Sequence, residues 1–390
     1  MASVAPLRMP YDGRDVPHAV IEVNQRCNIS CTACYKDKST YTKPLGQILE
    51  EIDLVARERR VGVLSLAGGE PTLHPELCTV ITEIARRGIQ VQLLTNGLDL
   101  SEERLWSYKD CGLARVYLHV DSLQKRRDAP GVTRECELDA LRERLAERVV
   151  RSGLACALTV TLYRTRNLAE LPSVVELVLH SRWFDRLLVT CCTDFAAIEA
   201  ALARNGGLPI VPSANARGLG DEVVSNAEVE LILARLGMTP FAFVASDRRA
   251  EERRWLFYYA FAARSPEGGA RALHLGPSFG RVARLANTLT KLGRGTYPFG
   301  ETRGRLANLA TCVAHAVASA DPRVLTETLG FLACLRTRGA TLTQKSFIFQ
   351  QGPSVTAEGA LEVCKACPDA TIRNGRLMPV CLADLLSPQA

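Results

Sequence analysis

Apolar runs of strand length alternate with helical periodicity through the first half of the chain. The runs predict six strands, at 19–24, 61–67, 89–95, 115–121, 155–163 and 186–192. Between them, apolar residues recur at helical spacing, which predicts helices at 45–59, 76–87, 102–111, 136–152 and 168–180. Alternation of this kind builds a parallel sheet with right-handed crossovers, so the sequence predicts an α/β fold.

Polar and small residues follow four of the predicted strands at the point where each strand ends. Parallel barrels carry their chemistry in the loops at the carboxyl ends of the strands, so these residues are expected to meet at one rim. In chain order, the loops hold three cysteines, Gly68-Gly69-Glu70, Thr95-Asn96-Gly97 and Asp121-Ser122.

Alternate residues of the predicted strand 115–121 form an apolar and a polar face. The apolar face is Val116, Leu118 and Val120, and the polar face is Tyr117, His119 and Asp121. The outside of a parallel barrel must be apolar where helices pack on it, so we expect the polar face to line the lumen. His119 is then either near the substrate or a hydrogen-bonded core histidine. Glu22 and Asn24 share a face of the first strand and are expected to line the lumen floor.

The loop after the first predicted strand holds three cysteines at CxxxCxxC spacing, Cys27, Cys31 and Cys34. Three thiolates can hold a four-iron cluster and leave one iron open to a small molecule. Three cysteines also suit zinc, but a structural zinc ion normally takes four protein ligands, and no His or Cys follows closely enough to be the fourth. The spacing therefore favours an iron–sulfur cluster over zinc.

The second strand runs into Gly68-Gly69-Glu70-Pro71 and then a helix start. Glycines lack a Cβ and let the backbone approach a ligand closely, and the Glu70 carboxylate beside them could hold an ammonium group. An ordinary strand-to-helix turn would show the same residues.

The segments VNQRCNISCTACY, LAGGEPTLHPEL and LLTNG together resemble the radical S-adenosylmethionine (SAM) superfamily, over at least residues 19–192. The resemblance implies an open, partial (β/α)6 barrel. It also implies that the open iron binds the amino and carboxylate groups of SAM, and that one electron cleaves SAM to methionine and a 5′-deoxyadenosyl radical. An electron donor such as flavodoxin or ferredoxin and sensitivity to oxygen are expected with this chemistry.

The resemblance also assigns SAM contacts to individual side chains. A GGE loop of this kind supports the amino group of SAM, and the aspartate and serine after the fourth strand are candidates for the ribose hydroxyls. Members of the family often carry an aromatic residue just before the third cysteine, where this chain has Ala33, so we expect the next tyrosine to contact the adenine instead. The predicted SAM contacts are Gly68, Gly69, Glu70, Asn96, Asp121, Ser122 and Tyr35.

The chain is expected to have three parts, a radical SAM partial barrel at 15–192, a mostly helical covering region at 193–340 and a C-terminal segment with an auxiliary cysteine cluster at 341–390. The first residues after the sixth strand are rich in Gly and Pro and predict a connection that includes Gly206-Gly207 and Pro212. Helical periodicity is then predicted at 226–264 and 301–338, separated by a Gly- and Pro-rich stretch. The arginine pairs at 248–249 and 253–254 are expected on a solvated helix face.

Three further cysteines, Cys364, Cys367 and Cys381, lie near the C-terminus, with Asn374-Gly375 between them as a predicted hairpin turn. A zinc ribbon needs a second CxxC pair, which is absent here. The spacing resembles the auxiliary-cluster region of the GTP cyclase family of molybdenum-cofactor biosynthesis, which implies a second four-iron cluster. That family carries arginines just after its second cysteine, where this chain has Pro368-Asp369-Ala370-Thr371, and the difference counts against GTP as substrate.

The segments CPDAT, PVCLAD and HVDSLQ look closer to a branch of pterin-methylating enzymes and archaeal enzymes that join lipid chains through carbon–carbon bonds. This resemblance implies methylation or carbon–carbon bond formation at an unactivated carbon of a small-molecule or lipid substrate. The alternatives are a molybdenum-cofactor-type radical cyclisation and peptide modification, although the seven-cysteine pattern of SPASM peptide-modifying enzymes is absent. A non-catalytic iron–sulfur redox protein is a distant alternative.

The remaining cysteines of the fourteen divide into two groups. Four of them are candidates for a fourth ligand of the second cluster, the first two favoured because they end the sixth strand, namely Cys191, Cys192, Cys312 and Cys334. The others fall in apolar helix or strand contexts and are expected to be packing residues, namely Cys78, Cys111, Cys136 and Cys156.

Composition agrees with a cytoplasmic enzyme. The 390 residues are 47% hydrophobic with a net charge of +6, which suits a sizeable core and only a mild charge imbalance. The N-terminus has no apolar signal core, and no stretch is long and apolar enough to span a membrane, so reduced thiols in the cytoplasm are expected. No interleaving of aromatic and basic residues suggests a nucleic-acid partner.

Overall fold

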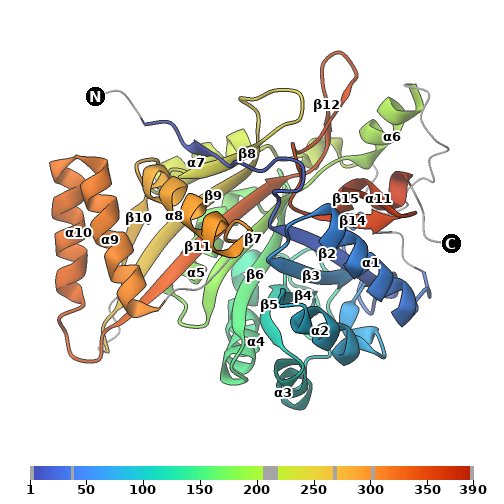
Figure 1. Cartoon of the computed structure of the whole chain (residues 1–390), viewed down its shortest axis with the longest axis horizontal. Coiled ribbons are helices and arrows are strands. Elements are labelled where there is room, and N and C mark those ends of the chain that lie inside the picture. Colours follow the sequence, from blue (N-terminus) through green and yellow to red (C-terminus); the bar gives the residue numbers. More distant parts are fainter. Residues whose placement is uncertain (1–3, 37–38, 205–217, 267–269, 300–303, 387–390) are drawn as a thin grey trace.

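Six parallel strands form one half of the central sheet, in the order of the chain, which confirms the predicted α/β fold (Figure 1). They are β2 (His18–Asn24), β3 (Val63–Gly68), β4 (Gln90–Thr95), β5 (Leu113–His119), β6 (Ala155–Leu162) and β7 (Phe184–Cys191). The computed structural model describes residues 4–36, 39–204, 218–266, 270–299 and 304–386.

The predicted helices between these strands are also present. They are α1 (Leu45–Glu58), α2 (Leu77–Arg86), α3 (Glu102–Asp110), α4 (Asp139–Arg151) and α5 (Leu171–His180). A short 3-10 turn precedes each of α2, α4 and α5. These turns are η1 (Pro71–Leu73), η2 (Glu135–Leu138) and η3 (Leu168–Glu170). The main hydrophobic core lies between helices and sheet, and Val116, Leu118 and Val120 are fully buried in it, as the alternation in β5 predicts.

The sheet continues beyond β7 with strands that the sequence did not reveal. β11 (Thr341–Gln351) pairs parallel with β7 and antiparallel with β9 (Arg253–Arg264). β9 also pairs with β8 (Ala242–Ala245) and β10 (Ala270–Leu275), and β1 (Leu7–Arg8) closes the edge beside β8. Strands from all three expected parts of the chain therefore share one sheet.

The helix predicted over 226–264 is correct only for α7 (Asn226–Arg235). β9 reads RRWLFYYAFAAR and is buried along nearly its whole length, so it lacks the alternation that marks a half-exposed strand. Its aromatic residues favour a strand, but a continuous apolar run cannot be told from a buried helix by periodicity.

The arginines expected on a solvated helix face instead lie at the start of β9 and in the turn before it. Arg254 is fully buried, and its Nη2 lies 2.7 Å from Glu362 Oε2. Arg249, which is about half exposed, pairs with the same carboxylate at 2.6 Å. The buried carboxylate explains why a charged side chain can leave the surface here.

Helices in the covering region are confirmed at 301–338, where α9 (Arg305–Ser319) and α10 (Pro322–Cys334) form a hairpin. α8 (Phe279–Arg294) falls in the stretch for which no helix was predicted. The connection after β7 holds α6 (Phe195–Arg204) and the turn η4 (Gly220–Glu222), whereas Gly206-Gly207 and Pro212 lie outside the described residues.

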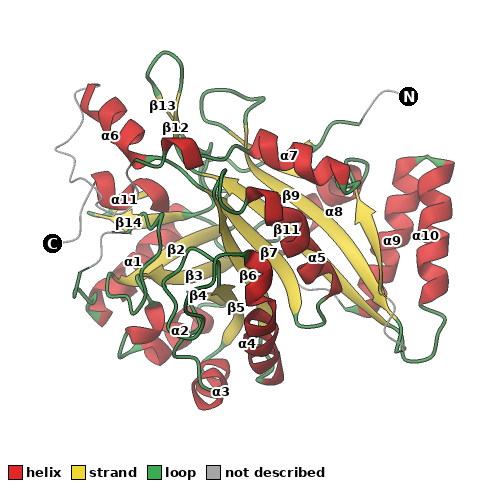
Figure 2. Ribbon diagram, turned by 180° about the vertical axis from the view of Figure 1, so that it is seen from behind, coloured by secondary structure: helices red, strands yellow, loops and turns green. Residues whose placement is uncertain are grey.

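The C-terminal segment packs beside β2, at the end of the molecule opposite to the α9–α10 hairpin in both views (Figures 1 and 2). It contains β12 (Ser354–Val355), β13 (Leu361–Glu362), β14 (Ala370–Arg373), β15 (Arg376–Pro379) and α11 (Val380–Leu386). Asn374 and Gly375 join β14 to β15 with φ angles of 48° and 69°, so the predicted hairpin turn is confirmed.

Four buried charges fasten this segment to the barrel, and we call them the buried quartet: Glu22, Lys36, Arg373 and Asp384. Lys36 Nζ lies 2.7 Å from Glu22 and 2.8 Å from Asp384, and Arg373 pairs with both carboxylates. Their side chains are at most 3% exposed. Neither Glu22 nor Asn24, both expected on the lumen floor, lines the cavity described below. Glu22 belongs to the buried quartet, and the Asn24 side-chain amide donates to the Glu70 carbonyl at 3.0 Å.

Replacing Arg373 with methionine should destabilise the protein strongly, because Glu22 and Asp384 would then share one buried cation. Removal of one partner from a buried pair costs about 3–5 kcal/mol. The matched control is Arg86→Met, which removes an exposed pair with Glu83 and should cost no more than about 1 kcal/mol. Denaturant unfolding followed by circular dichroism measures both. Equal stability of the two variants would show that the quartet does not fasten the C-terminal segment.

Candidate functional site

A cavity of about 240 Å³ lies at the carboxyl ends of the parallel strands, and both sets of three cysteines line it. The first set is Cys27, Cys31 and Cys34, in the loop after β2. The second is Cys364, Cys367 and Cys381, before β14 and in α11. The structure thus brings together two sets of thiols that lie more than three hundred residues apart in the chain.

The chemistry of this donor set fits two iron–sulfur clusters, since each set offers three thiols toward a shared space. Within the second set, a hydrogen bond with Cys364 and burial raise the pKa of the Cys367 thiol, and burial raises that of Cys381. Across the part of the chain that the structure describes, no three His, Cys, Asp or Glu side chains are arranged to hold a single metal ion.

The first cysteine loop is held by the loop after β5 and by the end of β6. Cys31 forms an isolated β-bridge with Gln124, and the Thr32 amide and hydroxyl both donate to the Leu123 carbonyl. The Ala33 amide donates to the Tyr163 hydroxyl at 3.0 Å. The positions of the three thiols are therefore fixed by neighbouring strands as well as by their own loop.

Gly68 and Gly69 lie against the backbone that leads into the first cysteine loop. This contact requires their small size, whether or not a ligand also approaches them. Gly68 has a φ of 139°, and a Cβ on it would lie closer than 3.0 Å to the Asn24 carbonyl. A Cβ on Gly69 would lie equally close to the Arg26 carbonyl. The close approach that requires glycine is therefore to the chain's own backbone, and it presses the two loops together.

Glu70 is buried and holds the loops after β3 and β4 together. Its Oε1 accepts from the Thr72 amide at 3.1 Å, the Thr72 hydroxyl at 2.7 Å and the Thr95 hydroxyl at 2.6 Å. Its Oε2 accepts from the Asn96 amide at 2.8 Å. Burial raises the pKa of the Glu70 carboxyl, although these hydrogen bonds oppose the rise. Glu70 and Asn96 both line the cavity.

Asp121 and Ser122, the predicted ribose contacts, do not line the cavity. Asp121 accepts from His119 Nε2 at 2.8 Å, and the Ser122 hydroxyl donates to Glu135 at 2.7 Å. Burial alone would raise the pKa of Asp121, but hydrogen bonds from His119 and two backbone amides hold it below its usual value. The contacts give both side chains a role inside the protein, and contact with SAM stays a prediction.

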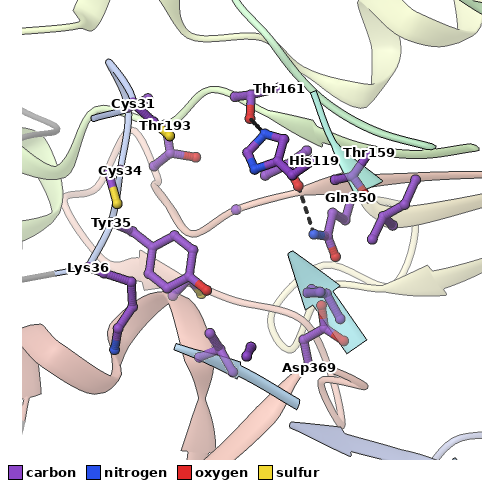
Figure 3. A pocket seen from close by; sticks show the side chains of 18 of the residues that line it. Cys31, Cys34, Tyr35, Lys36, His119, Thr159, Thr161, Thr193, Gln350 and Asp369 are labelled. Atoms are coloured by element: carbon purple, nitrogen blue, oxygen red, sulfur yellow. Dashed lines mark hydrogen bonds between the residues drawn. The ribbon is translucent and has the colours of Figure 1, made fainter. Parts of the chain in front are cut away.

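His119 lines the cavity and is also hydrogen-bonded, so it combines both expectations for this residue. Its side chain is 32% exposed, and its Nε2 lies 3.3 Å from the Thr161 hydroxyl (Figure 3). Asp121 behind it fixes the orientation of the ring.

Tyr35 lies in the cavity between Cys34 and Asp369 (Figure 3). Burial raises the pKa of its phenol well above the usual value, and the nearby Glu22 carboxylate adds to the rise. Ala33 lines the same cavity, and contact of Tyr35 with the adenine stays a prediction.

Several residues of the cavity wall had no signal in the sequence. Asp369 lines the cavity and pairs with His18 Nδ1 at 3.1 Å. Trp255 of β9 and Gln350 of β11 belong to strands that were not predicted, so their place in the wall could not be expected. Only a correct prediction of β9 and β11 could have pointed to these two residues.

The other cysteines separate by position. Cys191 and Cys192 are buried and line the cavity, whereas Cys312 and Cys334 lie on α9 and α10 and do not. The packing role holds for three of the remaining residues, which are buried or packed against the main core, namely Cys78, Cys111 and Cys156. It is wrong for Cys136, which is exposed because η2 turns it toward solvent.

The contact between the glycine loop and the cysteine loop can be tested by Gly69→Ala. A Cβ at this position collides with backbone rather than with a movable side chain, so we expect loss of the clusters and a lower unfolding midpoint. Gly46→Ala is the control, because Gly46 has open space around it in α1 and alanine there favours a helix by about 0.5–1 kcal/mol. Iron content and thermal unfolding measure both. Normal iron content in Gly69→Ala would contradict the predicted steric role.

Comparison with known proteins relates part of this chain to one family. Residues 21–178 match the family described as "Radical SAM superfamily". A "Probable GTP 3',8-cyclase" of Sulfurisphaera tokodaii is 30% identical over 175 residues, which cover 43% of this chain and 54% of that protein. A "GTP 3',8-cyclase" of Chlorobaculum tepidum is 31% identical over 170 residues, covering 42% of this chain and 51% of that protein.

The chain spans about half the length of these curated relatives. Among solved structures, Streptococcus suis SuiB bound to S-adenosylmethionine is similar with a TM-score of 0.40 and 14% identity, over 57% of this chain and 47% of that one. The matched residues 21–178 run from β2 into α5 and so include the first cysteine loop, the glycine loop and Glu70. Residues 21–178 of the protein therefore form a radical SAM domain.

Proposed function

We propose that the protein is an enzyme that cleaves SAM reductively and uses the 5′-deoxyadenosyl radical on an unactivated carbon of a small-molecule or lipid substrate. The reaction that fits best is methylation or carbon–carbon bond formation. One observation carries the proposal, namely that two sets of three cysteines line the same cavity. An enzyme that reacts SAM with a substrate beside an auxiliary cluster needs this arrangement.

Each set of thiols would hold one four-iron cluster. Cys27, Cys31 and Cys34 would hold the cluster that binds SAM, and Cys364, Cys367 and Cys381 the auxiliary cluster, with Cys191 or Cys192 as candidates for its fourth ligand. When bound, the first cluster supplies the electron that cleaves SAM. A flavodoxin or ferredoxin is the class of protein that would deliver it, in the cytoplasm.

Glu70 is placed to bind the ammonium group of SAM as well as to hold its own loops. Each carboxylate oxygen has two lone pairs, and among the described residues Oε2 accepts one hydrogen bond, from the Asn96 amide. The remaining lone pair can accept a charged hydrogen bond in a buried setting, where such a bond is strong. Gly68 and Gly69 keep this carboxylate next to the first cysteine loop.

Part of the cavity wall is apolar and suits an apolar part of a substrate. This part includes Val20, Leu94, Leu188, Trp255 and Val380. Apolar side chains next to a reactive radical limit its side reactions, because they offer it no exchangeable protons. The wall therefore supports a substrate that places hydrocarbon, rather than charge, next to SAM.

His119 can hold or accept a proton at this wall. Its Nε2 hydrogen is donated to Asp121, which leaves Nδ1 as an acceptor in the neutral ring. A substrate hydroxyl or amine near Nδ1 would be oriented by this acceptor.

Cyclisation of GTP is the second candidate, since relatives that match part of the chain carry that name. The cavity disfavours it. Among the described residues that line the cavity, Lys36 is the only lysine or arginine. The carboxylates of Glu22 and Asp384 already neutralise its charge. Asp369 adds an acidic side chain to the wall. A triphosphate needs several cations, so its burial here would be costly.

The paired cysteine sets give a test that separates their roles. Ala substitution of any one of Cys27, Cys31 or Cys34 should abolish formation of 5′-deoxyadenosine from SAM and dithionite under anaerobic conditions. The triple variant of Cys364, Cys367 and Cys381 should lose about half of its iron and still form some 5′-deoxyadenosine, but no product.

Cys136→Ala is the control, because this cysteine is exposed and away from the cavity. It should keep both iron and SAM cleavage. Normal turnover by a variant of the first set would refute the assignment of the SAM site. A protein that binds iron but never cleaves SAM would instead be the non-catalytic redox protein.

The charge of the cavity predicts that GTP is not the substrate. Adding GTP to the reconstituted protein with SAM should leave the rate of 5′-deoxyadenosine formation unchanged and give no cyclised nucleotide by mass spectrometry. A hydrophobic fraction of cell extract, tested in the same way, should increase the rate. Cyclised product from GTP would overturn this conclusion and favour the second candidate.

A further inference from the structure

Large exposed apolar side chains gather on three neighbouring helices, α8, α9 and α10. Of the eleven such residues among those that the structure describes, eight lie on α8, α9 and α10. They are Leu285, Leu289, Leu292, Leu306, Val313, Val317, Leu325 and Leu329. We call these eight residues the apolar face. A soluble surface normally scatters such residues singly, so their concentration indicates a contact surface.

α9 shows the pattern most clearly, because it exposes large apolar side chains although polar ones take up part of its buried side. That side carries Asn308, Thr311 and His315, each at most 6% exposed, together with Cys312 and Ala316. Its outer side carries Leu306 at 83% and Val317 at 74% exposure. A helix that only completed the core would bury its apolar stripe and expose its polar one.

α8 has apolar residues on both sides. Phe279 and Ala283 are buried against the sheet, whereas Leu285, Leu289 and Leu292 are 60% exposed or more. These leucines are spaced four and three residues apart, so they share one outward stripe. α8 packs against α9, and α9 against α10, so neighbouring helices each contribute to the apolar face.

The positive charge of the protein is concentrated in the same segment. Residues 270–340 contain ten Arg or Lys and three Asp or Glu, whereas the whole chain has a net charge of only +6. The rest of the chain is therefore close to neutral. On α8 and α9, Arg281, Arg284 and Arg305 belong to this group.

These charges select among possible occupants. A second copy of the chain would bring two positive faces together, which is unfavourable. An acidic electron-transfer protein would fit the charge, but the cysteine-lined cavity is bounded by α11, and α9 and α10 lie at the end of the molecule opposite to α11 (Figures 1 and 2). Electrons delivered at α9 and α10 would be far from either set of thiols. Nucleic acid offers phosphates but no partner for exposed leucine stripes.

We propose that α8, α9 and α10 dock the protein on an anionic lipid bilayer. The leucines and valines of the apolar face enter the boundary between headgroups and acyl chains, and the arginines beside them pair with lipid phosphates. Within the described residues, no helix has the length and apolarity to cross a bilayer, so this contact lies on the membrane surface. The inference does not depend on the chemistry in the cavity.

The test is co-sedimentation of the full-length protein with vesicles. Vesicles of equal parts phosphatidylcholine and phosphatidylglycerol should bind the protein, and binding should weaken as salt is raised. Vesicles of phosphatidylcholine alone should bind it at least about tenfold less, because single surface charges each contribute on the order of 1 kcal/mol. The double variant Leu285→Asp/Leu289→Asp should lose binding to the same extent.

Leu231→Asp is the matched control, since Leu231 is 67% exposed on α7, outside the apolar face. It should bind anionic vesicles as the unmodified protein does. Arg284→Gln/Arg305→Gln should weaken binding, whereas Arg144→Gln on α4 should not.

Two results would overturn the proposal. One is equal vesicle binding by Leu285→Asp/Leu289→Asp and Leu231→Asp. The other is a dimer, seen by light scattering, that Leu285→Asp/Leu289→Asp converts to a monomer, because the face would then belong to a second copy. SAM cleavage by each variant in detergent-free solution shows whether it has folded, and it should stay unchanged if the cavity works independently of docking.

Discussion

The buried quartet is the interaction on which the shape of the site depends. Lys36 follows Cys34 by two residues, and Arg373 and Asp384 stand on either side of Cys381. Charges removed from water are tolerated only when their partners are in place, so the quartet accepts one register of the C-terminal segment against β2. An apolar contact of similar area would allow sliding. The quartet therefore fixes where the second set of cysteines meets the first.

The wall opposite the quartet comes from the extension of the sheet. β11 enters beside β7, and β9 beside β11, which brings Gln350 and Trp255 to the cavity. The matched family region ends at residue 178, so this wall comes from a part of the chain beyond it. The matched region thus supplies the first cysteine loop, the glycine loop and Glu70, whereas Trp255 and Gln350 come from outside it.

The α9–α10 hairpin and the C-terminal cysteine segment lie at opposite ends of the molecule (Figure 1). The cavity is lined by residues from the carboxyl ends of the parallel strands, whereas α9 and α10 pack on β9, β10 and β11. A surface contact on α9 and α10 would leave the cysteine end open to an electron donor. β9 and β11 contribute to both regions because they are the longest strands of the described sheet.

The sequence by itself determined the first half of the fold, both cysteine sets and the turn at Asn374-Gly375. These features are local, because amphipathic periodicity, cysteine spacing and the dihedral preferences of a tight turn act within a few residues. Tertiary structure decided the rest. β9 is buried along nearly its whole length and so lacks an alternating pattern, and β11 carries mostly polar residues outside its short apolar run Phe347–Phe349. Arg373, a partner of Glu22, stands 351 residues away in the chain. Asp121 and Ser122 follow a strand as a SAM contact would, yet their nearest partners are His119 and Glu135. Which groups a polar side chain meets depends on packing between distant segments, and no local pattern encodes it.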